Sequence, residues 1–191
     1  MRPHHWVHLA GYAWIAFLFY WFLSAWKLKA TKRRESFAER LGHILPMAVA
    51  FYLLFNDAAS FAWLGRRLVP FSPAIGATGL ALTCAGVGFA IWARWHLGEN
   101  WSGSVTLKAG HELIRTGPYR FIRHPIYTGI LLATIGTTLA LDEWRGVISC
   151  GLVLITFYFK ARREERFLAQ EFGSGFDEHA RHTGMFLPRF S

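Results

Sequence analysis

Long apolar blocks alternate with short polar and basic segments along the whole chain. A helix needs roughly 20 mostly apolar residues to cross a bilayer, and several of these blocks approach or reach that length. The last two blocks are shorter, nearer to a partly buried hairpin than to two free spans. The pattern therefore predicts an all-α fold, a polytopic transmembrane bundle of about five spans, at about residues 6–26, 44–64, 74–95, 125–141 and 146–159.

Polar and small residues refine these blocks. Asn56 and Asp57 interrupt the second block, and because an unpaired carboxylate is costly in hydrocarbon, Asp57 is expected near an interface or against other protein. The third block is rich in glycine and alanine, and close helix packing is the expected use of Gly86 and Gly88. From Lys160 onward the sequence is charged and amphipathic, which predicts a helix that leaves the membrane, a glycine-containing stop and a tail.

The distribution of charge gives the predicted bundle an orientation. The chain is 53% hydrophobic and carries a net charge of +9, with its basic residues gathered at the ends of the apolar blocks. With five spans, segments 27–40 and 108–123 and the tail from residue 160 fall on one side, which the positive-inside rule makes cytoplasmic. We therefore expect an integral, multi-pass protein, in the inner membrane if the source is bacterial, with its N-terminus outside and its C-terminus in the cytoplasm. Arg66 and Arg67 lie on the other side and do not fit this rule.

The same distribution argues against several other classes of protein. Basic residues at helix ends are not a basic face, so no nucleic-acid partner is expected. Cys84 and Cys150 lie inside apolar blocks and do not form a disulfide framework. Histidines crowd the N-terminus in "HHWVH", but a terminal cluster without further converging ligands is not expected to hold a metal ion.

The stretch "GPYRFIRHPIYTG", residues 117–129, places arginines, tyrosines and a histidine at the start of the fourth block. Pro125 suits the first position of a helix, where its missing N–H costs nothing. His124 precedes a proline and is biased to an extended backbone, so its imidazole can project beside the helix N-terminus. The N-terminus of a helix favours the binding of a carboxylate. Tyr127 lies one turn on, and Gly129 leaves room for close packing against the backbone.

These residues alone leave two interpretations open. Arginines and tyrosines at this level of a membrane helix are also typical interfacial anchors, and that use fits Tyr119, Arg120, Arg123 and Tyr127. Glu164 and Glu165, in "KARREERFL", are either solvated partners of neighbouring arginines or carboxylates that reach the ribose hydroxyls or ammonium group of a cofactor. A hairpin formed by the last two spans would bring the two sets of residues together, and this favours a binding site.

The motifs "GHELIRTGPYRFIRHPIYTG" and "EERFLAQEFG", separated by an apolar hairpin, resemble the isoprenylcysteine carboxyl methyltransferase family of integral membrane enzymes. Its wider relatives are phospholipid N-methyltransferases and, more distantly, membrane sterol reductases. The resemblance covers about residues 96–189, and the core R-H-P-x-Y-x-G with a downstream E-E pair is its specific part. It implies a single integral membrane domain over 1–191, in which 96–191 is the methyltransferase core and the two spans in 1–70 have no assigned role.

The resemblance implies that S-adenosyl-L-methionine is the cofactor and S-adenosyl-L-homocysteine its product, enclosed at the cytoplasmic side by the last spans and the C-terminal tail. The motif residues that would bind it are His111, Glu112, Leu113, Ile114, Tyr119, His124, Pro125, Ile126, Tyr127, Glu164 and Glu165. A basic residue shortly before the E-E pair would orient the methyl acceptor. Lys160 takes this position where the family more often has arginine, and Arg163 lies close by.

The implied reaction is transfer of a methyl group to a lipophilic acceptor, most simply the carboxylate of an isoprenylcysteine-like molecule or related lipid. An ionised carboxylate needs no general base, so catalysis would rest on positioning and on exclusion of water. Two alternatives remain: an NADPH-dependent membrane reductase of the sterol type, and a non-catalytic membrane protein that retains the fold. The sequence does not decide whether the acceptor is a carboxylate, an amine or a thiol, nor the oligomeric state.

Overall fold

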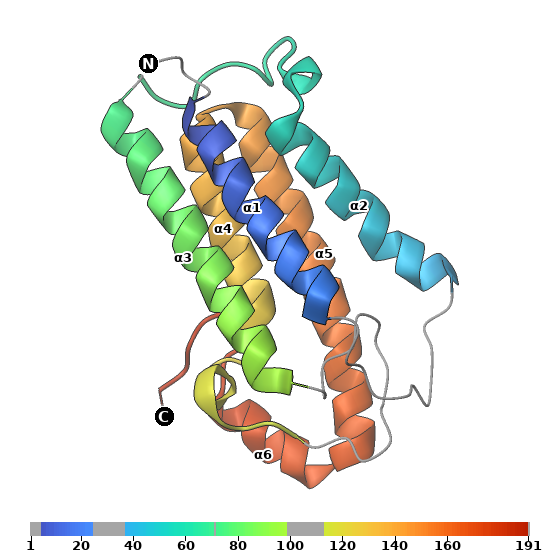
Figure 1. The fold of residues 1–191 in the computed structure, drawn as a ribbon. Coiled ribbons are helices and arrows are strands. Elements are labelled where there is room, and N and C mark those ends of the chain that lie inside the picture. The colour runs from blue at the N-terminus through green and yellow to red at the C-terminus, as the bar shows by residue number, and fades with distance from the viewer. Residues whose placement is uncertain (1–4, 25–36, 71, 99–112, 191) are drawn as a thin grey trace.

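The computed structural model describes residues 5–24, 37–70, 72–98 and 113–190, and its elements in these segments are helices (Figure 1). Three helices, α1, α3 and α5, are long and apolar enough to cross a membrane, and α4 and most of α2 are shorter apolar helices beside them. The predicted all-α transmembrane bundle is therefore confirmed. The elements are α1 (His5–Ser24), α2 (Phe37–Phe55), η1 (Asp57–Ala59), α3 (Pro73–Leu97), η3 (Gly117–Arg120), α4 (Pro125–Leu141), α5 (Trp144–Phe172) and α6 (Ser174–His182).

Helix ends differ from the expected spans where local hydrogen bonds stop a helix earlier or later. The second span ends at Phe55, not near residue 64, because the Asn56 side chain accepts a 2.9 Å bond from Ala58 N and starts the short helix η1. Asp57 thus lies at a helix end, as its cost in hydrocarbon requires. The fifth span continues as one helix to Phe172 and stops at Gly173, whose φ of +50° favours glycine.

Small residues set the closest helix contact of the bundle, the antiparallel pair α3 and α4. A Cβ on Gly86 would clash with Ala133 N and lie 2.6 Å from Gly129 O, so the two backbones touch. Gly79 meets α4 in the same way one heptad earlier. At Gly88 nothing lies within 4 Å of the position that a Cβ would take. The expected role in close helix packing therefore holds for Gly86 and not for Gly88.

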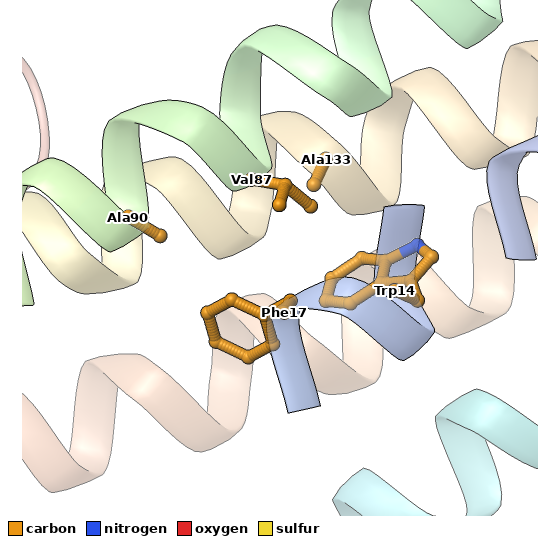
Figure 2. Packing of buried hydrophobic residues seen from close by; sticks show 5 residues of the cluster. All are labelled: Trp14, Phe17, Val87, Ala90 and Ala133. Carbon is orange, nitrogen blue, oxygen red and sulfur yellow. The ribbon is translucent and has the colours of Figure 1, made fainter. Parts of the chain in front are cut away.

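Helix α1 covers this pair with aromatic side chains. Figure 2 shows Trp14 and Phe17 of α1 facing Val87 and Ala90 of α3 and Ala133 of α4. The indole Nε1 of Trp14 donates a 2.9 Å hydrogen bond to a threonine hydroxyl of α4. Helix α2 instead packs mainly along α5, where the buried Ala50 of α2 contacts the buried Val153 and Phe157 of α5. The result is a bundle in which α3, α4 and α5 carry the site at one end.

Candidate functional site

One end of the bundle gathers the start of α4, the charged second half of α5, helix α6 and the chain's last residues (Figure 1). His124 lies directly before α4, with Pro125 at the first position of the helix, as the sequence predicts. The imidazole is buried, with a side chain 6% exposed. Its backbone is fixed from both sides: His124 N donates to Met185 O, and Thr128 N donates to His124 O.

The imidazole of His124 lies between two adjacent carboxylates of α5. Nδ1 is 3.5 Å from Glu164 Oε2, and Nε2 is 3.3 Å from Glu165 Oε1. The hydroxyl of Tyr127 donates a 2.6 Å hydrogen bond to the other oxygen of Glu164. Because an imidazole carries an N–H on both nitrogens only when protonated, the two contacts together favour the imidazolium form.

Aromatic rings extend this cluster into the bundle. The rings of His124 and Tyr127 are parallel with centroids 5.4 Å apart, and Tyr127 in turn stacks on Phe157 at 4.4 Å. The Nζ atom of Lys160 lies 5.8 Å from the centroid of the Tyr127 ring. One stack therefore joins the buried histidine, the tyrosine that holds Glu164 and a lysine of the next helix.

Arg123 lies in the interior of this site. The sequence had left open whether this arginine is a site residue or an interfacial anchor. Its side chain is 14% exposed, and its Nε donates a 2.6 Å bond to Glu165 Oε1. Arg120, in contrast, is exposed beside the ring of Phe121, where an interfacial anchor belongs. Two features of the sequence could have separated Arg123 from Arg120. Arg123 directly precedes His124, and the downstream motif contains a second glutamate, Glu165, that can pair with it.

The C-terminal residues 183–189, here called the strap, run alongside the segment before α4. Gly184 N donates to Phe121 O at 3.1 Å, and Arg123 N donates to Gly184 O at 2.8 Å. The hydroxyl of Thr128 donates a 2.7 Å bond to Phe186 O. The sequence predicts only a tail here, because backbone pairing of a short irregular segment leaves no pattern in side-chain types.

The remaining candidate residues lie beside the charged cluster or outside the described part of the chain. Tyr119 and Ile126 form a buried apolar cluster with the end of α3, and Ile114 packs against it. Burial, together with the charge of the nearby Glu164, raises the pKa of Tyr119 far above its usual range, so its hydroxyl stays neutral. Pro125 is buried, Leu113 and Arg163 are half-buried, and His111 and Glu112 lie outside the described residues.

The charge state of His124 gives a pH prediction. Burial alone would lower the pKa of His124, but hydrogen bonds and charge from Glu164 and Glu165 outweigh it, and the pKa is raised. A raised pKa in the folded state adds stability that is complete below the ordinary value and is lost as pH rises through the raised one. We therefore expect the unfolding temperature to fall from about pH 6.5 upward, and to fall less in His124→Gln.

Thermal unfolding in detergent across this pH range, followed by circular dichroism, checks the expectation. The control is His5→Gln, because His5 is exposed near the start of α1, and this variant should keep the wild-type pH dependence. Identical pH profiles for the wild type and His124→Gln would contradict the charged bridge.

Comparisons with known proteins bear on the same residues. Residues 75–175 match the phospholipid methyltransferase family, a region that runs from the start of α3 to α6 and contains His124, Tyr127 and Glu164. The probable protein-S-isoprenylcysteine O-methyltransferase of Oryza sativa subsp. indica is 35% identical over 109 residues, which are 56% of this chain and 52% of that protein. The cobalt-zinc-cadmium resistance protein CzcN of Cupriavidus metallidurans is 31% identical over 131 residues, 68% of this chain and 55% of that protein.

A solved structure shares the fold. The eukaryotic intramembrane Ras methyltransferase ICMT aligns with a TM-score of 0.54 at 22% identity, over 78% of this chain and 53% of that chain. The chain spans about half the length of these relatives.

Proposed function

The chain belongs to the phospholipid methyltransferase family, and on this premise we propose that it is a membrane-embedded methyltransferase that uses S-adenosyl-L-methionine to methylate a lipophilic acceptor. The observation that carries the proposal is the convergence of His124 and Tyr127 on Glu164 at the mouth of α4. These residues come from the two motifs that resemble isoprenylcysteine carboxyl methyltransferases, and 37 positions separate Tyr127 from Glu164.

The donor set at this end of the bundle fits such a cofactor. Glu164 has acceptor capacity beyond its bonds to Tyr127 and His124, which suits ribose hydroxyls or an ammonium group. The first amides of α4 have no partner within the helix, and a helix N-terminus favours a carboxylate. The rings of Tyr127 and Phe157 offer faces that attract a cation. When bound, the cofactor supplies an electrophilic methyl group on a positively charged sulfur.

The protein's own residues have positioning roles in this proposal. His124 and Tyr127 hold Glu164 in one orientation, and the burial of His124 keeps bulk water from this part of the site. Lys160, beside the Tyr127 ring, is placed to bind an acidic acceptor, and Arg163 lies on the same helix. A carboxylate acceptor is already ionised, so these residues need not remove a proton.

The acceptor class follows from the relatives and the setting together. Two relatives carry names that refer to isoprenylcysteine, and we propose that the acceptor is the carboxylate of an isoprenylcysteine-like molecule or a related lipid. Such a molecule can reach the site from the bilayer. We further propose that the end bearing the site faces the cytoplasm, because five spans put the basic segments 27–40 and 108–123 and the basic tail from residue 160 on one side.

Calorimetric titration of the detergent-solubilised protein with S-adenosyl-L-homocysteine tests the proposal. We expect saturable binding to the wild type and at least about tenfold weaker binding to Glu164→Ala and His124→Ala. The first variant removes the carboxylate proposed to accept from the ligand, and the second removes a side chain that holds this half-buried carboxylate in place. Glu171→Ala is the matched control, because Glu171 is exposed on the same helix as Glu164. NADPH is titrated in parallel as the ligand of the reductase alternative.

Two results would overturn these assignments. Wild-type affinity in both alanine variants would reject the site. Saturable binding of NADPH in place of S-adenosyl-L-homocysteine would reject the methyltransferase function itself.

A further inference from the structure

The two adjacent glutamates of α5 share His124, but each also accepts from a partner of its own. Tyr127, in the first turn of α4, donates to Glu164, whereas Arg123, before α4, donates to Glu165. The imidazole of His124 contacts both carboxylates. Consecutive residues of a helix lie about 100° apart around its axis, so the two side chains leave α5 in different directions and can bind different partners.

Arg123 connects Glu165 to the strap. The Nε atom donates to Glu165, while Nη1 donates to the carbonyl oxygens of Ala180, at 3.1 Å, and of Thr183. These carbonyls lie at the end of α6 and the start of the strap, where a helix presents unpaired acceptors and favours a cation. A planar guanidinium can serve the carboxylate and both carbonyls at once, which a lysine ammonium does not match in geometry.

Polar contacts carry much of the strap's attachment to the bundle. Phe186 packs against the apolar cluster between α2 and α5, but Leu187, near the end of the strap, is 76% exposed, so its burial contributes little to closure. The strap also covers His124: Met185 O accepts from the His124 amide, and the Phe186 ring lies 6.1 Å from the imidazole. Release of the strap would therefore expose the histidine that orients Glu164.

We propose that Arg123 and Glu165 are positioning residues that latch the strap over His124, and that Glu164 alone of the glutamate pair is directed to the cofactor. The part concerning the cofactor rests on the proposed function. The latch itself is a property of the protein without ligand, so it can be tested separately. Loss of either latch residue opens the strap, and the affinity for ligand then falls in proportion to the fraction of molecules that remain closed.

Hydrogen exchange of the full chain in detergent, followed by mass spectrometry, tests the latch. In Glu165→Gln and Arg123→Gln, peptides covering the strap should exchange about tenfold faster or more, because each variant removes a hydrogen bond between charged groups. In Glu164→Gln the strap should exchange as in the wild type. Unchanged exchange in α3 and α4 shows that the bundle itself is intact, and Glu165→Asp, which keeps the carboxylate, should give intermediate exchange.

Titration with S-adenosyl-L-homocysteine adds the functional arm. Glu164→Gln should lose most of the affinity, whereas Glu165→Gln should keep part of it, and saturating ligand should slow strap exchange in Glu165→Gln again, since binding and closure are linked reciprocally. The double variant Arg123→Gln/Glu165→Gln should lose less than the sum of the two single losses, because the bond between Arg123 and Glu165 is removed in each single variant.

The outcomes separate the latch from the proposed function. Unchanged strap exchange in Glu165→Gln and Arg123→Gln, or equal opening in Glu164→Gln, would overturn the latch. Strap opening that follows these two residues, in a protein that binds no S-adenosyl-L-homocysteine, would support the latch and reject the cofactor assignment. Restored protection in Glu165→Gln on saturation with ligand supports both.

Discussion

Replacing Gly86 by leucine is expected to force α3 and α4 apart and to destabilise the bundle by about 3 kcal/mol or more. The reason is geometric: even the first carbon of a side chain at Gly86 would clash with Ala133 N and lie 2.6 Å from Gly129 O, which are backbone atoms that cannot turn away. Thermal unfolding in detergent, followed by circular dichroism, measures the effect, and Gly136→Leu on the opposite helix should behave alike, since Gly136 meets Thr83 in the same way.

Gly88→Leu is the matched control for this prediction. Gly88 lies on the same helix two residues away, and nothing is within 4 Å of the position its Cβ would occupy. Leucine also has the better helix propensity, by under about 1 kcal/mol, so this variant should be neutral or slightly stabilised. Equal losses in Gly86→Leu and Gly88→Leu would show that glycine matters there for a reason other than close helix approach.

The helices could be predicted from the sequence because their signal is local. The lengths of the apolar blocks predicted the ends of α1, α3 and α4 to within about two residues. The end of α2 could not be read in this way, because the residues after Asn56 are still apolar and only the bond from its side chain to Ala58 stops the helix. The register of α3 against α4 was likewise beyond the sequence, since Gly86 and Gly88 differ only in what faces them.

The charged residues at the opposite end show the same limit. Arg67 did not fit the positive-inside rule, but its guanidinium is paired with Asp142 just after α4, at 2.9 Å from Nε. Arg145, 1% exposed, is paired with Glu143 at 2.6 Å and also donates to Asn56 O at the end of α2. These arginines join loops that are far apart in the chain. A count of charges per loop cannot detect such partners.

The part of the site that is formed by the motif residues could be predicted from the sequence. The family resemblance is confirmed, and the expectation that a histidine before α4 and a glutamate of α5 lie together agrees with the 3.5 Å between His124 and Glu164. Arg123 remained open between anchor and site because its partners, Glu165 and the carbonyl of Thr183, lie 42 and 60 residues away. Whether these residues bind S-adenosyl-L-methionine stays a prediction.

Lys160→Ala is expected to reduce methyl transfer to a carboxylate acceptor by about a hundredfold in kcat/KM, because it removes the cation proposed to pair with that carboxylate. Its Nζ lies 5.8 Å from the Tyr127 ring, on the side of α5 that carries Glu164 one turn later. The affinity for S-adenosyl-L-homocysteine should change by less than about threefold, because His124 and Tyr127 still hold Glu164. Transfer of a labelled methyl group to an S-prenylated cysteine with a free carboxylate measures the effect.

Lys160→Arg and Arg162→Ala make this prediction specific. Arginine keeps the positive charge and adds a fork that matches a carboxylate, so Lys160→Arg should retain most of the activity. Arg162 is exposed on the same helix, and its loss should leave kcat/KM near the wild-type value, which separates a local contact from a general effect of basic charge at this end. A Lys160→Ala protein with unchanged kcat/KM would remove this lysine from the acceptor site. An equal loss in Lys160→Ala and Arg162→Ala would instead assign the effect to the electrostatic potential of the whole surface.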